Sequence, residues 1–249
     1  MSANSPPPAL NGVLVLDKPA GITSMRAVEI VRRRAGGVRA GHAGTLDPLA
    51  TGVLLIALGA ATKQIATLMA GTKRYETEID LSATTATLDA EAARVEVPVE
   101  SPPSEATVRQ ALRAFVGSIQ QRPPAFSAIK LGGQRAWRLA RRAGGTRDAA
   151  AAEAATAAIE PRIVRVHSLE LDSFVWPLVR LRVHSDKGFY VRSLARDLGA
   201  ALATGGYCTL IRRTAVGPFT LDQARSLESL GSVGPTDLLS VPPAASPES

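Results

Sequence analysis

The longest apolar stretch of the chain runs from Gly52 to Ala61 and constrains the fold more than any other segment. It is far shorter than the roughly 18 residues that a membrane-spanning helix needs. Within it, Val53–Leu58 is continuously apolar, which is typical of a strand buried on both faces. Lys73–Leu81 instead alternates polar and apolar residues, with Tyr75 on the apolar side, and this predicts a strand with one buried face. We therefore expect a globular protein built around a sheet, with no part in a membrane.

The other periodic segments add helices to that sheet. A basic helix is predicted over Ser24–Ala35, with Ser24 as its cap and Met25 facing inward, and Ala60–Ala70 predicts a second helix. Further elements are expected in this order: a helix after Ser104, strands over Ile163–Phe174 and Trp176–His184, a helix over Tyr190–Leu202, and a strand over Tyr207–Thr214. Because no βαβ repeat connects them, the sequence predicts an α+β fold with a mixed, largely antiparallel central sheet flanked by helices.

The chain ends and the cysteine content limit the class of protein further. Residues 1–10 contain three consecutive prolines but neither a basic nor an apolar signal region, so we expect a disordered leader and a cytoplasmic location. Cys208 is the sole cysteine, which excludes an internal disulfide and a multi-cysteine metal site. The three histidines are far apart in the sequence, so no metal is expected.

The charge of the chain favours a polyanionic partner. Lys and Arg total 29 against 22 Asp and Glu, which gives a net charge of +7, and only five of the 29 are lysines. Residues 122–147 hold seven cations and no acid, whereas residues 76–105 hold eight acids and one arginine. A segregated basic surface of this kind is typical of nucleic-acid binding, because arginine suits phosphate pairing and base stacking. The alternative is a general arginine bias without a binding role.

The segment Gly41–Gly52 is the best candidate for a site. It holds His42, Asp47 and three glycines just before the apolar strand. Pro48 disfavours a helical conformation at Asp47, and the glycines allow close approach of backbone or ligand. From the residues alone, a functional carboxylate and an ordinary Asp-Pro turn are about equally supported. His42 is as readily a hydrogen-bonded spacer as a ligand.

A second candidate segment is Lys187–Arg192. Tyr190 and Arg192 stand where a strand is expected to lead into a helix, and a buried arginine there could hold a carboxylate in its ionised form. Core packing by Tyr190 and Tyr75 and a surface position for Arg192 are the alternatives. The chain has no glycine-rich nucleotide-binding loop and no nucleophile elbow, so ATP, dinucleotide and hydrolase functions lose their main support.

Taken in order, these segments resemble the TruB family of tRNA pseudouridine synthases. Leu16–Ser24 is similar to the entry motif of that family, Gly41–Gly52 to its G-H-x-G-T-L-D-P-x-A-x-G motif, and Lys73–Tyr75 follows at the expected distance. Arg122–Lys130 and Gly188–Gly199 resemble later motifs, with Arg212–Thr214 last. The resemblance covers about residues 10 to 220. The sequence departs from the family at Ser82 and Ala92, where glycine is usual, at Phe189 and at Trp137.

The resemblance implies a pseudouridine synthase fold and roles for individual residues. Asp47 would be the catalytic aspartate, Tyr75 would stack on the target base, Arg192 would pair with Asp47, and Lys18 would be a supporting residue. Tyr190 and Ile211 would line the pocket, and His42 would hold the flipped-out base or the remodelled loop. A basic thumb is expected within residues 104–160, with an alanine-rich insertion at 148–158, and its predicted RNA contacts are Arg122, Lys130, Arg135, Arg138, Arg141 and Arg142.

The implied activity is isomerisation of uridine to pseudouridine in the T-loop of tRNA, at position 55, without cofactor, metal or guide RNA, by a monomer. The catalytic domain would span residues 11–220, and residues 221–249 would be a short extension with no full PUA-type RNA-binding domain. Two other functions remain as alternatives. One is a non-catalytic tRNA-binding folding chaperone, and the other is a guide-RNA-dependent catalytic subunit of the dyskerin type.

Overall fold

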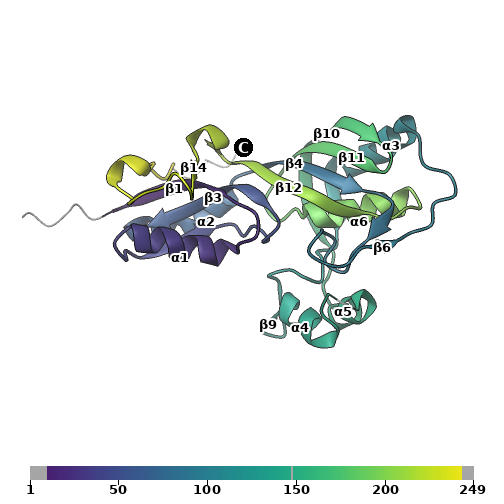
Figure 1. Ribbon diagram of the computed structural model, residues 1–249, viewed down its shortest axis with the longest axis horizontal. Helices are drawn as coiled ribbons and strands as arrows, with labels where there is room; N and C mark the ends of the chain where they lie inside the picture. Colours follow the sequence, from purple (N-terminus) through teal and green to yellow (C-terminus); the bar gives the residue numbers. More distant parts are fainter. Residues whose placement is uncertain (1–9, 147, 243–249) are drawn as a thin grey trace, which may run out of the picture. The chain divides into compact units, whose positions relative to one another are not determined.

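The computed structural model describes residues 10–146 and 148–242 of the 249-residue chain (Figure 1). The predicted leader therefore lies outside the described residues apart from Leu10, as do Arg147 and residues 243–249. The chain divides into two compact units: unit 1 comprises residues up to Thr72 together with those from Arg213 onward, and unit 2 comprises Lys73–Arg212. Unit 2 is thus an insertion within the sequence of unit 1.

The sheet of unit 1 is built around the apolar segment. Strand β3 (Thr51–Leu58) pairs antiparallel with β1 (Gly12–Lys18) and with β2 (Ala40–Ala43), and all residues of Val53–Leu58 are buried, as predicted. Its strand order is β14-β1-β3-β12, and β14 (Arg225–Ser226) is parallel to β1. The short strand β13 (Phe219–Thr220) pairs with β12 (Tyr207–Val216), whose residues are divided between the two units.

Helix α1 (Ser24–Arg34) forms where it was predicted but begins differently. Thr23, not Ser24, caps it, because the Thr23 hydroxyl accepts a hydrogen bond from the Arg26 N–H at 3.1 Å. The buried side of α1 consists of Ser24, Ala27, Val28 and Val31. Met25 lies about 100° around the helix from Ser24 and is 55% exposed, so the prediction that it faces inward is wrong.

The second predicted helix of unit 1 is divided into two parts. A 3₁₀ helix, η1 (Gly59–Gln64), precedes α2 (Ile65–Ala70), which ends before Gly71 as expected. Both α1 and α2 pack against β2. Beyond β13, the chain contributes two 3₁₀ turns, η3 (Leu221–Gln223) and η4 (Pro235–Asp237), and a backbone bridge between Val13 and Leu239. The C-terminal segment is therefore part of the unit 1 fold.

Unit 2 contains a sheet with the order β12-β4-β11-β10-β7, in which β4, β11, β10 and β7 pair antiparallel. The strands are β4 (Lys73–Asp80), β11 (Leu178–Ser185), β10 (Arg162–Val175) and β7 (Gly117–Gln121). The alternation predicted for β4 is present, with Thr77 and Ile79 buried and Arg74 and Glu76 exposed. The described sheets contain a parallel pair, β1 with β14, among antiparallel ones, which confirms the mixed, largely antiparallel α+β fold.

The helices of unit 2 follow the predicted pattern with local differences. Ser104 caps α3 (Glu105–Leu112), which continues into η2 (Arg113–Phe115), and α6 (Val191–Ala201) starts after Tyr190. The two-stranded pair β5 (Ala83–Thr84) and β6 (Val95–Glu96) was not predicted.

The segment between β7 and β10 forms a small hairpin and two helices. The hairpin consists of β8 (Lys130–Leu131) and β9 (Gln134–Arg135), and it leads into α4 (Ala136–Ala143). The alanine-rich insertion contains a second helix, α5 (Ala149–Ala155), whose first turn is capped because the Asp148 carboxylate accepts from the Ala151 N–H at 2.9 Å. We call β8, β9, α4 and α5 the thumb.

Candidate functional site

The loop that carries Asp47 is fastened by Lys18. The Lys18 side chain is fully buried, and its ammonium donates to the backbone carbonyls of Pro19 and Ile22 at 2.8 Å and of Pro48 at 3.2 Å. The Gly21 N–H donates to the same Pro48 carbonyl at 2.9 Å. Because three carbonyl oxygens converge on one ammonium, the residue after Asp47 is held against the end of β1. This geometry fits the supporting role expected for Lys18.

Two further side chains hold the same loop from other elements of unit 1. The Ser24 hydroxyl donates to the Leu46 carbonyl at 2.9 Å and accepts from the Leu46 N–H at 2.8 Å, which ties the start of α1 to the residue before Asp47. Arg213 on β12 is buried and donates to the carbonyls of Val53 at 2.8 Å and Gly44 at 3.1 Å. Asp47 itself is half-buried on this fixed loop.

Glycine is required at the end of the loop. Gly52 has φ +97°, and a Cβ at this position would lie 2.2 Å from the backbone oxygen of Arg213. No side chain can be accommodated at that distance without moving β12 or the loop. The close approach of the two backbones explains the glycine that ends the motif.

His42 lies on β2 in the same unit, half-buried beside this loop. Burial and, secondarily, the charge of Arg213 lower the pKa of His42 below its usual value of 6.5. Its Nδ1 atom is buried and has no hydrogen-bond partner. The imidazole therefore favours its neutral form, and its buried Nδ1 is left unsatisfied within unit 1.

In unit 2, Arg192 on α6 forms a buried ion pair with Asp89. Its Nε atom is 3.6 Å from the Asp89 carboxylate, and the two side chains are 4% and 2% exposed. The guanidinium also donates to the carbonyls of Thr87 at 2.7 Å and Phe126 at 2.9 Å. A charge that is buried this deeply is costly unless it is paired, so Asp89 fixes both the position and the charge of Arg192. The expected pairing of Arg192 with Asp47 stays a prediction.

Tyr190 precedes α6 and is held by Gln121 on β7. The Tyr190 N–H donates to Gln121 Oε1 at 2.8 Å, and Gln121 Nε2 donates to the Tyr190 carbonyl at 3.1 Å. The guanidinium of Arg162 lies 5.2 Å from the centre of the Tyr190 ring, within the range of a cation–π contact. The ring is half-buried and its backbone is fixed on both sides.

The other two predicted pocket residues lie on the sheet of unit 2. Tyr75 is on β4 opposite Val183 of β11 and is half-buried, and Ile211 is on β12 with 5% exposure. Tyr75, Tyr190, Arg192 and Ile211 therefore belong to unit 2, whereas Lys18, His42 and Asp47 belong to unit 1.

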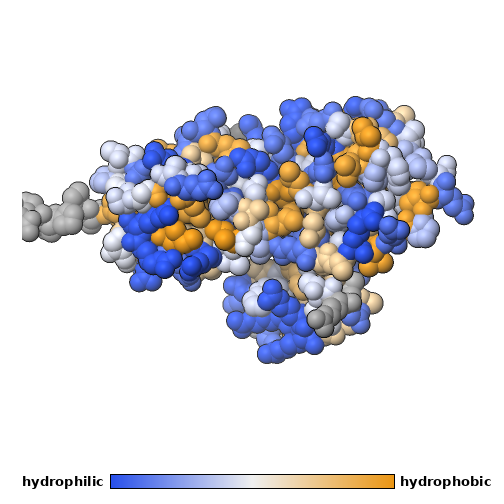
Figure 2. Space-filling model, viewed as in Figure 1, coloured by the Kyte–Doolittle hydropathy of each residue, from blue (hydrophilic) through white to orange (hydrophobic). Residues whose placement is uncertain are grey.

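The thumb carries most of the predicted RNA contacts. Trp137 on α4 is flanked by two guanidiniums, those of Arg138 and Arg141, at 5.2 and 5.3 Å from its ring centre. Arg138, Arg141 and Arg142 are exposed, and Figure 2 shows hydrophilic side chains gathered over α4. Aromatic rings stack on bases and arginines pair with phosphates, so a cluster of these residue types is suited to a nucleic acid.

The remaining predicted contacts have internal partners or flank α4. Arg135 and Lys130 are exposed on the hairpin, and Arg135 donates to the Ala128 carbonyl. Arg122 donates to the Ala157 carbonyl at 2.9 Å, which ties the segment after β7 to the chain after α5. Arg122 therefore has a structural contact in addition to any contact with RNA.

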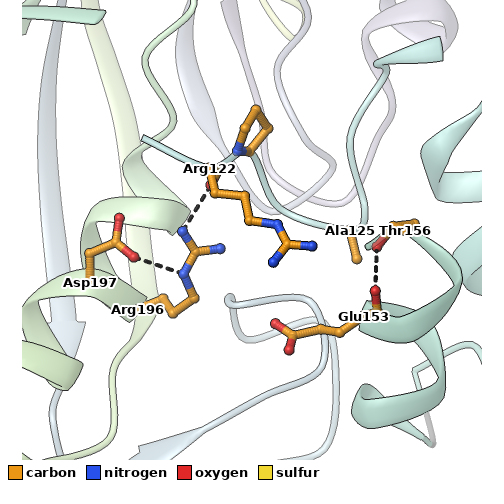
Figure 3. Close-up of a pocket in the computed structure, with 7 residues that line it drawn as sticks. Arg122, Ala125, Glu153, Thr156, Arg196 and Asp197 are labelled. Atoms are coloured by element: carbon orange, nitrogen blue, oxygen red, sulfur yellow. Dashed lines mark hydrogen bonds and ion pairs between the residues drawn. The ribbon is translucent and has the colours of Figure 1, made fainter. Parts of the chain in front are cut away.

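A pocket of about 330 Å³ lies at the base of the thumb (Figure 3). Its charged lining consists of Arg122, Glu153, Arg196 and Asp197. Arg196 donates to the Asp197 carboxylate and to the Arg122 carbonyl, both at 2.8 Å. The two positive and two negative side chains balance, and none of the predicted pocket residues Tyr75, Tyr190, Arg192 and Ile211 lines this space.

No metal site or membrane segment is found where the structure is described. Within residues 10–146 and 148–242, no group of three or more His, Cys, Asp or Glu side chains is arranged to hold a metal ion. No helix in that part of the chain is long and apolar enough to cross a bilayer.

Sequence reasoning missed the residues that hold the site in place. Asp89 and Gln121 contact Arg192 and Tyr190, and Ser24 and Arg213 contact the loop of Asp47, in each case from about 20 to 170 residues away along the chain. The only available signal was residue type, since an aspartate within the mostly small and apolar segment Ala83–Ala92 suggests a buried partner. The sequence did not identify that partner.

Comparisons with known proteins show which family this chain resembles. Residues 32–191 match the family described as "TruB family pseudouridylate synthase (N terminal domain)". The chain is 45% identical over 230 residues to tRNA pseudouridine synthase B of Thermobifida fusca, covering 89% of this chain and 75% of that protein. It is 44% identical to the protein of the same name from Aromatoleum aromaticum, covering 89% of this chain and 68% of the relative.

The solved structures that resemble this one support the same fold. A chain in a Cbf5-Nop10-Gar1 complex superimposes on this structure with a TM-score of 0.66 at 29% identity. A chain in an H/ACA RNP bound to a substrate RNA superimposes with a TM-score of 0.62 at 27% identity. Each match covers 87% of this chain, which spans about half the length of those proteins. From the matched domain, the relatives and the fold together, we conclude that this chain belongs to the TruB family of pseudouridine synthases.

Proposed function

We propose that this protein isomerises uridine to pseudouridine in the T-loop of tRNA, at position 55, with Asp47 as the catalytic carboxylate. The observation that carries the proposal is the loop of Asp47, which Lys18, Ser24 and Arg213 hold by buried hydrogen bonds in a chain of this family. So much anchoring is unnecessary for an ordinary turn and is typical of a preorganised reactive group. The named relatives are tRNA pseudouridine synthases.

The chemistry requires no cofactor. The bond between uracil N1 and ribose C1′ breaks, the base turns, and a bond forms between C1′ and C5. The C5 proton is released to water and N1 gains a proton, so the product is an isomer. An ionised Asp47 can act as nucleophile towards the base or the sugar, or can remove a sugar proton, and each of these roles needs a fixed carboxylate.

The other candidate residues would bind the substrate base. Because a base inside folded RNA is inaccessible, it must be flipped out before reaction. Tyr75 would stack on the flipped base, Tyr190 and Ile211 would line its pocket, and neutral His42 would hydrogen bond to the RNA. Arg192, charged and fixed by Asp89, would pair with Asp47 and hold it ionised.

The thumb would bind the phosphate backbone. Replacing Arg138 and Arg142 by Glu should weaken tRNA binding and reduce its dependence on salt, because both side chains are exposed on α4. Arg109→Glu on α3 with Arg113→Glu on η2 is the matched control, since it reverses two exposed charges elsewhere in unit 2. Equal binding by both double variants would place the RNA on another surface.

The experiment is tritium release from unmodified tRNA that carries 5-tritiated uridine, without added metal or cofactor. We expect release by the wild type and none by Asp47→Asn, whereas Asp222→Asn, an exposed aspartate of unit 1, should release tritium at the wild-type rate. Loss of the tritium from a single position of the T-loop would identify the site. Release by Asp47→Asn at the wild-type rate would contradict the proposal.

The two alternatives give different results in the same assay. A tRNA-folding chaperone would bind tRNA without releasing tritium from any variant. A guide-dependent subunit would release tritium only when guide RNA is added, whereas we propose that a cytoplasmic monomer acts on bare tRNA. Sedimentation of the active protein as a single chain would support the monomer.

A further inference from the structure

The exposed basic end of α1 has no function in the site described so far. Arg32 and Arg33 in its last turn and Arg39 just beyond it are exposed, and we call these three residues the α1 basic surface. Figure 2 shows strongly hydrophilic side chains over α1, the purple helix of Figure 1. Arg34 is not part of this surface, because its guanidinium donates to the Leu227 carbonyl at 2.5 Å.

The charges of the α1 basic surface are not neutralised within the described chain. Some exposed arginines have acidic partners, as in the pairs Arg26–Glu29 and Arg109–Glu105. No acidic partner is found for Arg32, Arg33 or Arg39 within residues 10–146 and 148–242. Helix-dipole stabilisation accounts for cations in the last turn of α1 but not for Arg39, which lies outside the helix.

The surface is also shaped by its backbone. The N–H of Gly37 donates to the Arg32 carbonyl at 2.8 Å, and Arg32 Nε donates back to the Gly37 carbonyl at 3.3 Å. Gly36 and Gly37 both have positive φ, +68° and +83°, so the chain turns sharply after the helix. Arg32 is thereby held with its remaining N–H groups free, and Arg39 follows this turn by two residues.

The surface is rigidly connected to the loop of Asp47. Ser24, the first residue of α1, bonds through its hydroxyl to both backbone groups of Leu46. At 1.5 Å per residue, Arg33 lies about 14 Å along the helix from Ser24. Helix α1 therefore joins the proposed catalytic loop to Arg32 and Arg33, and Arg39 follows the turn after the helix, all within unit 1.

We propose that the α1 basic surface binds phosphates of the substrate RNA at a distance from the reacting uridine, in the segment that flanks the T-loop. This inference rests on the proposed function, because it assigns the partner to be the RNA whose target base reacts at Asp47. Guanidinium groups bind phosphate oxygens through paired N–H donors. A lipid surface is disfavoured, because the apolar side of α1 is buried in unit 1 and cannot enter a bilayer.

The test is the salt dependence of tRNA binding, measured by filter binding from 0.05 to 0.5 M salt. Each lost phosphate contact reduces the slope of log K against log salt by about 0.7 to 0.9. Arg33→Gln with Arg39→Gln should therefore reduce the slope by about 1.4 to 1.8, which corresponds to roughly 15- to 30-fold weaker binding at 0.15 M salt. Arg33→Lys with Arg39→Lys keeps both charges and should retain most of the affinity.

The controls separate this inference from the proposed function. Arg109→Gln with Arg113→Gln removes two exposed charges from α3 and η2 and should bind tRNA within about twofold of the wild type. An unchanged slope for the Arg33 and Arg39 glutamine variant would overturn the inference, as would an equal loss of slope in the lysine variant, which keeps both charges. Tritium release by the wild type tests the proposed function independently, so either can fail while the other holds.

Discussion

Replacing Lys18 by Met tests whether the Asp47 loop depends on its anchor. Met has nearly the volume of Lys but donates no hydrogen bond, so the change removes the three bonds to Pro19, Ile22 and Pro48 and leaves the packing almost intact. A charge-assisted hydrogen bond contributes about 1.5 kcal/mol, so three contribute about 4.5 kcal/mol before the desolvation cost of the buried ammonium. The Gly21 N–H still satisfies Pro48. We therefore expect a net destabilisation of about 2 to 3 kcal/mol.

For a chain of this size, that loss lowers the melting temperature by roughly 4 to 12 °C. Because a reactive group displaced by about 1 Å costs on the order of 100-fold in rate, kcat for tritium release should fall about 100-fold, while the Kd for tRNA changes little. Lys63→Met is the matched control, since Lys63 is exposed on η1 of the same unit, and it should change neither quantity. Wild-type melting and turnover in Lys18→Met would refute the anchoring role.

Three further changes test other contacts of the site. Asp89→Asn leaves the buried guanidinium of Arg192 without its countercharge and should lower the free energy of unfolding by about 3 kcal/mol in denaturant titration. Asp172→Asn, in an exposed ion pair, should lower it by about 1 kcal/mol or less. Equal losses would show that burial of the ion pair does not matter. Gly52→Ala combines a positive φ with a clash against the β12 backbone and should lower the free energy of unfolding by about 2 to 5 kcal/mol. Gly36→Ala has a positive φ but free space around it and should lower the free energy of unfolding by about 1 to 2 kcal/mol. Similar losses would show that the clash at Gly52 is relieved. The His42 imidazole should titrate below pH 6.5 by NMR, because burial and the nearby arginine lower its pKa. As the pH falls through 6.5, the unfolded chain binds the proton first, so His42 destabilises the fold in acid. A midpoint at or above 6.5 would contradict its burial.

The fold could be predicted from the sequence where periodicity was strong. The uninterrupted apolar run of β3 and the alternation of β4 each indicated the correct element and its buried faces. Boundaries and caps were less predictable, as at α1, where Thr23 caps the helix because Ser24 is engaged with Leu46. A hydroxyl at a helix start can bond the helix or a distant loop, and the local sequence does not distinguish the two.

The site could be predicted in part for the same reason. Motif resemblance indicated Asp47, Tyr75 and Arg192, which have chemistry of their own, but not Asp89, whose role depends on a contact across 103 residues of sequence. The position of Ser24 opposite Leu46 likewise follows from tertiary packing. Such positioning residues carry no local pattern, so they were found only when the chain was folded.

The order in which the chain leaves the ribosome has a consequence for unit 1, because its sequence is interrupted by unit 2. Residues up to Thr72 emerge first, yet β1 must wait for β14 and Leu239, and the loop of Asp47 must wait for Arg213. At about 5 to 20 residues per second, the roughly 140 intervening residues take about 7 to 28 s to synthesise. During this interval β3, the most apolar strand, has β1 and β2 as partners but belongs to an incomplete sheet, so its apolar residues are less well covered than in the folded protein. The enclosed unit 2 can fold first, so the anchored carboxylate is among the last features of the molecule to form.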